Sequence, residues 1–207
     1  MPFVDLLPIL IGWIIAISSP GPATMAIAGT AMEGGRARGL AVAWGVASGS
    51  VMWSLIAGLG LSAAMLANLW LVEGLRYAGA LYLGYLAVKS ARSAMRPGGL
   101  KAQASDAETL FSAWARGALV HMTNPKAVLF WGALFAVAVP AGSSGWVVFE
   151  VGAACLTTSF LTMTLMALAF SSRPVARAYI KARRWFEATF AVLFGFAAFK
   201  ILTAQFA

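Results

Sequence analysis

Four stretches of this chain, each longer than 20 residues, carry no charged side chain: residues 6–32, 39–72, 127–149 and 151–172. A helix needs about 20 predominantly apolar residues to cross the hydrocarbon core of a membrane, which is about 30 Å thick. Soluble domains average about 25% charged residues, whereas this chain has 11% and is 61% hydrophobic. The runs therefore predict an integral membrane protein, and they exclude a soluble globular domain and a disordered chain.

The expected fold class is all-α, with six transmembrane helices separated by turns that are rich in glycine, proline and polar residues. The helices are expected near residues 3–31, 40–66, 69–90, 113–139, 146–170 and 187–206. Residues 173–184 form a basic linker, which suits a helix lying at the membrane interface.

The charge distribution predicts an orientation. Of the 15 Lys and Arg residues, 12 lie in or beside the connections that follow the first, third and fifth helices, whereas the opposite side has only Arg76. Because basic loops stay in the cytoplasm, both termini are expected outside the inner membrane. The positive charge thus sets orientation in a lipid bilayer, and no basic stripe points to nucleic acid as a partner.

Two of the expected helices are interrupted near their middles. The first contains Ser18-Ser19-Pro20-Gly21-Pro22 and the fourth contains Thr123-Asn124-Pro125-Lys126. Proline removes a backbone donor and breaks a helix, and paired broken helices in two halves of a chain point to a transporter site. Each break opens a set of three helices, so the second set must insert upside down. The expected domains are two inverted repeats, residues 1–95 and 113–207, joined by a polar linker over 96–112.

The breaks supply the candidate substrate-binding residues. Lys126 is the leading one, because a lysine inside a membrane helix is costly and faces the bundle interior, a partner or water. Its alternative role is structural, donating to carbonyl groups that the breaks leave free. The full set of candidates is Ser19, Pro20, Gly21, Pro22, Thr24, Thr123, Asn124, Pro125 and Lys126.

Candidates for proton coupling are fewer, because no carboxylate is expected at mid-membrane. They are His121, whose ordinary pKa is near 6.5, and the acids Glu150 and Asp5 at external helix ends, where interfacial anchoring is the other interpretation. Gly45 and Gly49 form a GxxxG pattern, which permits close packing within the bundle or a homodimer. No metal-ligand cluster, phosphate-binding loop or catalytic set is present, so neither a cofactor nor an enzymatic activity is expected.

Four motifs in order resemble one family. They are Ser19-Pro20-Gly21-Pro22, Gly34-Gly35-Arg36-Ala37-Arg38-Gly39, Tyr77-Ala78-Gly79-Ala80-Leu81-Tyr82-Leu83 and Thr123-Asn124-Pro125-Lys126-Ala127. The set is similar to the lysine exporter / homoserine-threonine efflux (LysE/RhtB) family. The resemblance implies a dimeric inner-membrane exporter of amino acids, driven by an ion gradient, in which the two breaks meet at the translocation site. Two positions depart from the family, which often has Asp near Ser159 and Asn at His121.

The functional hypothesis is a secondary transporter that exports a small zwitterionic amino acid or derivative by alternating access. Two alternatives remain open: a passive channel or small-ion exporter, and a membrane scaffold whose broken helices only pack. The sequence does not name the substrate, because the walls of the pocket come from several helices.

Overall fold

The computed structural model describes residues 3–19, 21–67, 69–95, 109–139 and 143–203, and all of its regular elements in these ranges are helices. In chain order they are α1 (Phe3–Ser18), α2 (Pro22–Glu33), α3 (Gly35–Ala67), α4 (Leu69–Met95), α5 (Leu110–Met122), α6 (Pro125–Ala138), α7 (Gly145–Phe170) and α8 (Arg173–Thr203). The all-helical expectation is confirmed for the described residues.

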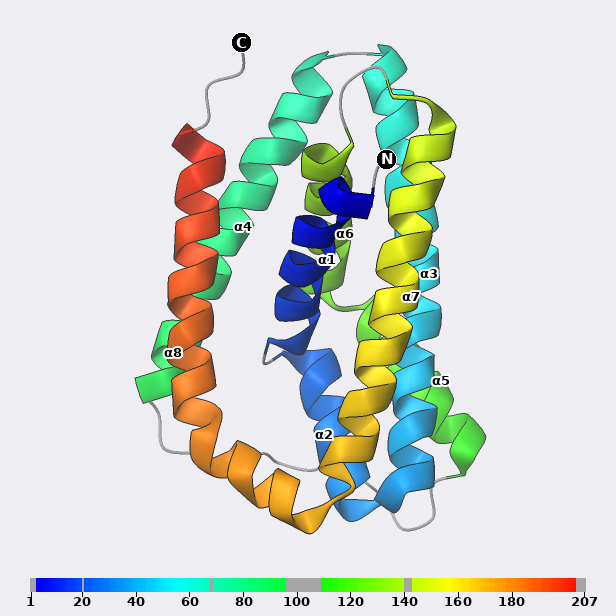
Figure 1. Cartoon of the computed structure of the whole chain (residues 1–207), viewed down its shortest axis with the longest axis vertical. Helices are drawn as coiled ribbons and strands as arrows, with labels where there is room; N and C mark the ends of the chain where they lie inside the picture. Colours follow the sequence, from blue (N-terminus) through cyan, green and yellow to red (C-terminus); the bar gives the residue numbers. More distant parts are fainter. Residues whose placement is uncertain (1–2, 20, 68, 96–108, 140–142, 204–207) are drawn as a thin grey trace.

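Both expected breaks are present, so the first and fourth helices become the pairs α1–α2 and α5–α6. The expectation of a separate sixth helix over 187–206 is wrong at its start. The basic segment before it is helical too, and α8 runs without interruption from Arg173 to Thr203. In Figure 1 the first part of α8 lies across the end of the bundle before the helix turns along it.

Length and hydropathy alone identify fewer membrane spans than the six expected. Within the described ranges, the regions Gly35–Gly60 and Gly145–Phe170 are long and apolar enough. The pair Leu6–Ser18 and Pro22–Glu33 would add one span, bent by 63° at the break. The helices α4 and α8 carry charged side chains among their apolar residues, which lowers their mean hydropathy. The chain is thus an α-helical membrane protein, and its division into six spans stays a prediction.

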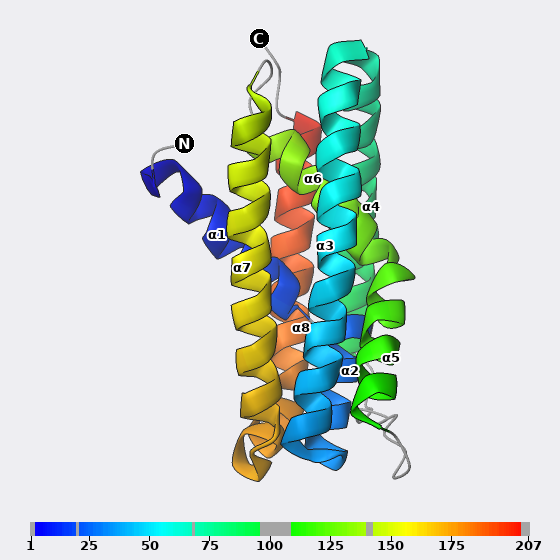
Figure 2. The same ribbon diagram turned by 90° about the vertical axis from the view of Figure 1, so that its right-hand side faces the viewer.

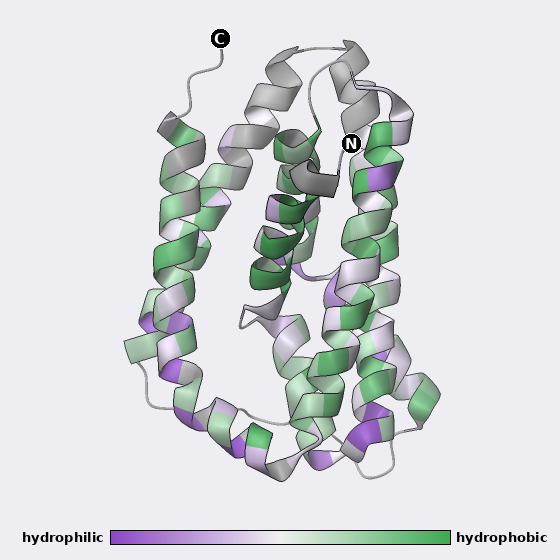
Figure 3. Cartoon of the chain, viewed as in Figure 1, coloured by the Kyte–Doolittle hydropathy of each residue, from purple (hydrophilic) through white to green (hydrophobic). Residues whose placement is uncertain are grey.

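The surface of the bundle matches a membrane environment. Large apolar side chains are exposed on several helices, including Leu59, Leu81, Val137, Val192 and Phe199. Exposed apolar surface on this scale is rare on soluble monomers. Figure 3 shows hydrophilic residues gathered at the end of the bundle where α2 meets α3 and α7 meets α8. The N-terminal end of α1 and the C-terminal end of α8 point toward the opposite end of the bundle (Figures 1 and 2).

Two glycines allow α3 and α5 to pack in direct backbone contact. A Cβ atom on Gly45 would lie 1.9 Å from the carbonyl oxygen of Trp114, and one on Gly117 would lie 2.3 Å from that of Val42. The GxxxG pattern of α3 is therefore used inside the bundle, as its Gly49 also faces His121 of α5. This face of α3 is not available to a second copy of the chain.

Two apolar clusters pack at different levels of the bundle. One gathers Trp13, Trp131, Phe135 and Val151 from α1, α6 and α7. The other is built from buried residues of α2, α3, α5 and α7, with Met163 among them. Along the chain, each of the two helix breaks separates residues of one cluster from residues of the other.

Candidate functional site

The first break ends α1 at Ser18 and starts α2 at Pro22. Ser19 is fully buried, and its hydroxyl donates to the carbonyl of Ala16 at 2.7 Å. The hydroxyl of Thr24 donates to the carbonyl of Ser19 at 2.9 Å. These side chains satisfy carbonyl groups that the interrupted helix leaves without backbone donors. Pro22 begins α2, where a missing backbone N–H costs nothing.

The second break lies between Met122 and Pro125. Asn124 is buried and caps the N-terminus of α6, because its side-chain oxygen accepts a hydrogen bond from the backbone N–H of Lys126 at 3.1 Å. Thr123 is exposed, and its hydroxyl donates back to the carbonyl of Leu119. The break is therefore held by Asn124, while Thr123 belongs to the end of α5.

The side chain of Lys126 joins the two breaks. Its Nζ donates to the hydroxyl of Ser19 and, at 3.4 Å, to the Ser19 carbonyl. The same ammonium group lies 5.6 Å from the ring centroid of Phe130 and 5.7 Å from that of Phe194. A Cβ atom on Gly21 would lie 3.7 Å from Nζ. The ammonium thus sits against the first break, with aromatic rings of α6 and α8 around it.

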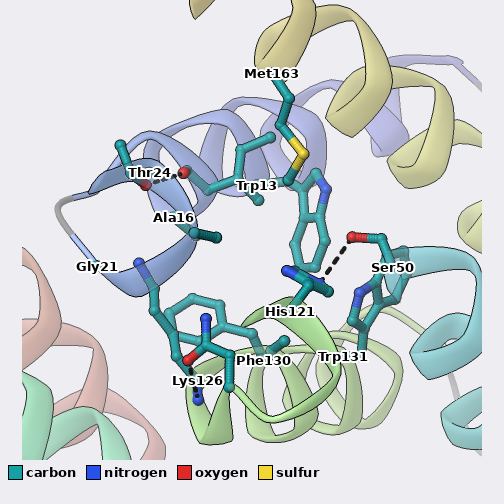
Figure 4. Close-up of a pocket in the computed structure, with 14 residues that line it drawn as sticks. Trp13, Ala16, Gly21, Thr24, Ser50, His121, Lys126, Phe130, Trp131 and Met163 are labelled. Atoms are coloured by element: carbon teal, nitrogen blue, oxygen red, sulfur yellow. Dashed lines mark hydrogen bonds between the residues drawn. The ribbon is translucent and has the colours of Figure 1, made fainter. Parts of the chain in front are cut away.

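A cavity opens beside this contact (Figure 4). It leaves about 40 Å³ for the centres of water-sized spheres, whereas one ordered water needs about 10–15 Å³. The space therefore suits a few waters or one small solute. Its polar lining is Thr24, Ser50, His121, Asn124 and Lys126, and its aromatic lining is Trp13, Phe130 and Trp131.

His121 lies in this lining with one ring nitrogen unsatisfied. Its Nε2 is 2.9 Å from the hydroxyl of Ser50 on α3, and only 6% of the residue is exposed. The Nδ1 atom is buried and has no hydrogen-bond partner among the described residues. A buried polar group without a partner costs about 1–3 kcal/mol, so this atom needs an explanation.

The other candidates from the sequence are placed as follows. Pro22 is exposed, and Glu150 is half-buried in the early part of α7; neither lines the cavity. Pro20 lies outside the described residues, as do the side chains of Pro125 and Asp5. The structure therefore brings together Ser19, Gly21, Thr24, Asn124 and Lys126, with His121 on another wall of the cavity.

Three further polar residues lie near the site; the sequence analysis missed Ser50 and Glu187, and it named Ser159 only as a departure from the family. Ser50 is buried against His121. Ser159 accepts a hydrogen bond at 2.8 Å from the indole N–H of Trp13, a cavity-lining residue. Glu187 is 3% exposed on α8 and accepts from the hydroxyl of Ser93 at 2.8 Å. Glu187 is a buried carboxylate that the sequence analysis did not single out, and whether it lies at mid-membrane is not tested by its burial.

The electrostatic character of the cavity is positive. The N-termini of α2 and α6 lie at the two breaks, and each carries about half a positive charge from the helix dipole. Lys126 adds a positive charge when it is protonated, and no acidic residue is among the described residues that line the cavity. This arrangement can hold the carboxylate of a small solute, because helix N-termini and ammonium groups both bind anions.

Comparisons with known proteins identify the family of this chain. Residues 14–205 match the family described as LysE type translocator. The chain is 26% identical to the threonine efflux protein of Escherichia coli, over 87% of this chain and 89% of that one. It is 30% identical to the leucine efflux protein of an Enterobacter species, over 84% of this chain and 82% of that one. No solved structure shows a significant match. This chain belongs to the LysE type translocators.

Proposed function

We propose that this chain is a secondary transporter that exports small amino acids or their derivatives across the inner membrane by alternating access. The observation that carries the proposal is the contact between the breaks, in which Lys126 of α6 donates to Ser19 beside a cavity. Family membership and the efflux proteins among the relatives supply the substrate class. Lys126 and the N-termini of α2 and α6 would hold the carboxylate of a zwitterionic substrate.

Helix packing supports an inverted repeat as the scaffold for this mechanism. Helix α3 packs against α5 and α7 packs against α1, while α4 packs against α8 and α3 against α7. Exchanging the two halves of the chain turns the first of these contacts into the second, and turns each of the other two into itself. Residues 1–95 and 113–207 would then rock against each other around the breaks, with both termini outside. A homodimer remains part of the proposal, through a face other than the GxxxG face of α3.

Several residues are candidates for carrying the proton that would couple transport to an ion gradient. His121 lines the cavity, Glu150 does not, and the side chain of Asp5 lies outside the described residues. Glu187 joins the sequence candidates because it is a buried carboxylate on α8, the helix whose Phe194 ring lies 5.7 Å from the Lys126 ammonium. We place Glu187 first among the acids, since a group that carries a proton through a transport cycle must communicate with the site.

The direct test is transport by the purified chain in proteoliposomes, with a panel of amino acids and their N-acetyl derivatives that includes L-threonine and L-leucine. We expect counterflow of at least one amino acid, and faster export with a pH gradient than without it. Lys126→Met removes a charge-assisted hydrogen bond, worth about 1.5–3 kcal/mol, so transport should fall at least about tenfold. Lys181→Met, at an exposed position on α8, is the matched control and should transport normally.

Other results would point to the alternatives. Unchanged transport by folded Lys126→Met would remove Lys126 from the site. Flux without counterflow would indicate a passive channel. A chain that transports nothing, and that no member of the panel stabilises against heating, would be a scaffold.

A further inference from the structure

Hydrogen-bond accounting fixes which ring nitrogen of His121 carries the proton. A neutral imidazole has one donor and one acceptor nitrogen. Within the described part of the chain, the hydroxyl of Ser50 has a single partner, Nε2 of His121. If Ser50 donates to Nε2, the ring proton is on Nδ1, and Nδ1 is the one group left unsatisfied.

The opposite arrangement leaves one more buried polar group without a hydrogen-bond partner. If Nε2 donated to Ser50, the hydroxyl hydrogen of Ser50 would have no acceptor and the Nδ1 lone pair would have no donor. Two buried groups would be unsatisfied instead of one, and each such group is costly. A doubly protonated ring would also carry a proton on Nδ1. In both protonation states, therefore, Nδ1 is an N–H donor without an acceptor.

The orientation of this donor suggests what it binds. Figure 4 shows the ring of His121 held by Ser50 on one side, with its other edge facing the interior of the cavity between Trp13 and Lys126. The acceptors nearest the first break are already used, since the Ser19 carbonyl accepts from Thr24 and Lys126. No described residue accepts from Nδ1, so the acceptor would come from a water or solute that enters the cavity.

We infer that Nδ1–H of His121 is a second donor to the carboxylate of the substrate, and that Ser50 positions it by holding the ring in this tautomer. A carboxylate has two oxygens and about four acceptor sites. Lys126 has three N–H groups and gives two of them to Ser19, so it can satisfy only part of a carboxylate. This inference rests on the proposed function, and it assigns His121 to substrate binding.

Two substitutions at His121 distinguish a role in binding the substrate carboxylate from a purely structural contact with Ser50. The amide nitrogen of Asn is attached to Cγ, as Nδ1 is, so His121→Asn keeps a donor near the cavity and loses the contact with Ser50. The terminal amide of Gln reaches the Nε2 position, so His121→Gln keeps the contact with Ser50 and loses the cavity donor. A purely structural histidine should tolerate Gln better than Asn, and a carboxylate-binding histidine should show the reverse.

The probes are L-leucine and two analogues that each lack one charged group, 4-methylpentanoate without the amine and 3-methylbutylamine without the carboxylate. Binding to the purified full chain is measured by calorimetry. We expect His121→Gln to bind leucine and 4-methylpentanoate about 10- to 100-fold more weakly than wild type and to bind the amine unchanged. His121→Asn should stay within about threefold of wild type, and Ser50→Ala should weaken binding of both acids less than His121→Gln does.

Unchanged acid binding by His121→Gln would overturn the inference, as would equal losses for Gln and Asn or an equal loss for the amine. If His121→Gln does not fold, normal acid binding by Ser50→Ala overturns the positioning role. L-Threonine and L-2-aminobutyrate form a further arm, because a His121 effect confined to threonine would assign Nδ1 to the side-chain hydroxyl. Binding of 4-methylpentanoate that depends on His121, in a chain that does not transport leucine, would uphold the donor and refute the exporter.

Discussion

Asn124 performs two tasks with one side chain. Its oxygen caps α6 through the backbone N–H of Lys126, and its burial places it in the wall of the cavity. The cap fixes the direction in which α6 leaves the break, and hence the position of the Lys126 side chain. The residue that caps α6 therefore also helps to fix the position of Lys126 at the candidate site.

Replacing this cap should destabilise the protein. We expect Asn124→Ala to cost about 0.5–2 kcal/mol, which corresponds to a melting temperature lower by about 2–4 °C for each kcal/mol. Asn124→Ser keeps an oxygen that can accept from the same N–H and serves as the control. Thermal unfolding followed by tryptophan fluorescence measures both variants, and equal melting temperatures for all three proteins would contradict the capping role.

Glu187 supports a prediction on coupling. Glu187→Gln keeps an oxygen that can accept from the Ser93 hydroxyl but removes the titratable charge. We expect its counterflow to persist while its export no longer accelerates with a pH gradient. Glu33→Gln, at an exposed residue at the end of α2, is the control and should keep the acceleration. The measurement is export from proteoliposomes at several imposed gradients, and a Glu187→Gln protein that still responds like wild type would exclude Glu187.

Features that depend on local backbone chemistry could be predicted from the sequence, whereas contacts between distant residues could not. Proline and asparagine act on their own backbone, so the break at Asn124 was predictable from local chemistry. The pairing of Ser50 with His121 joins residues 71 positions apart. It depends on how α3 and α5 are rotated against each other, and a single sequence does not encode that rotation in any local pattern. Buried Glu187 was missed for the same reason, because its partner Ser93 lies on α4.

At the level of elements, α3 and α5 are the helices whose contact depends most on glycine. Gly45 and Gly117 face the backbone of the opposite helix, and this close approach brings Ser50 within hydrogen-bond distance of His121. The spacing of the GxxxG pattern predicted close packing. It left open whether the partner was within the bundle or a second chain, and the structure places it within.

Substitution of Gly45 should disrupt this helix pair. The Cβ atom of Gly45→Ala would lie 1.9 Å from a backbone oxygen of α5, so the helices must move apart, at a cost of about 1–3 kcal/mol. Gly60→Ala, on the same helix as Gly45, is the control, because a Cβ atom at Gly60 would meet nothing within 4 Å. We expect a lower melting temperature and weaker leucine binding for Gly45→Ala alone. Similar values for both variants would contradict the packing argument.

The start of α8 shows a different limit of sequence analysis. Residues 173–184 contain five basic side chains, which predicted a basic linker that suits a helix at the membrane interface, separate from the sixth membrane helix. In the structure the segment is helical and continues into the apolar part of α8, with Tyr179 packed on Phe170 at a ring-centroid distance of 4.7 Å. The charged residues indicated that this segment lies near the interface. They did not indicate where the helix begins, because a linker and an amphipathic helix are both rich in charged residues.

For the whole molecule, the distribution of basic residues makes a prediction on orientation. Arg36 and Ser144 are exposed at opposite ends of the bundle, at the starts of α3 and α7. The only cysteine, Cys155, is buried and can be replaced by Ser to give a cysteine-free background. In that background, a membrane-impermeant thiol reagent added to whole cells should label Ser144→Cys and spare Arg36→Cys. The reverse labelling would invert the topology, and labelling of inside-out vesicles provides the matching control.

The contact between Lys126 and Ser19 has a consequence for the half of a transport cycle in which no cargo is carried. After releasing its cargo, a carrier must turn back empty, and a bare ammonium in a dehydrated site would make that return slow. Here the ammonium already rests on Ser19 and faces two aromatic rings. In the proposed cycle, Ser19 would therefore keep the Lys126 ammonium hydrogen-bonded while the carboxylate is absent, and the rate of the empty return would depend on this contact.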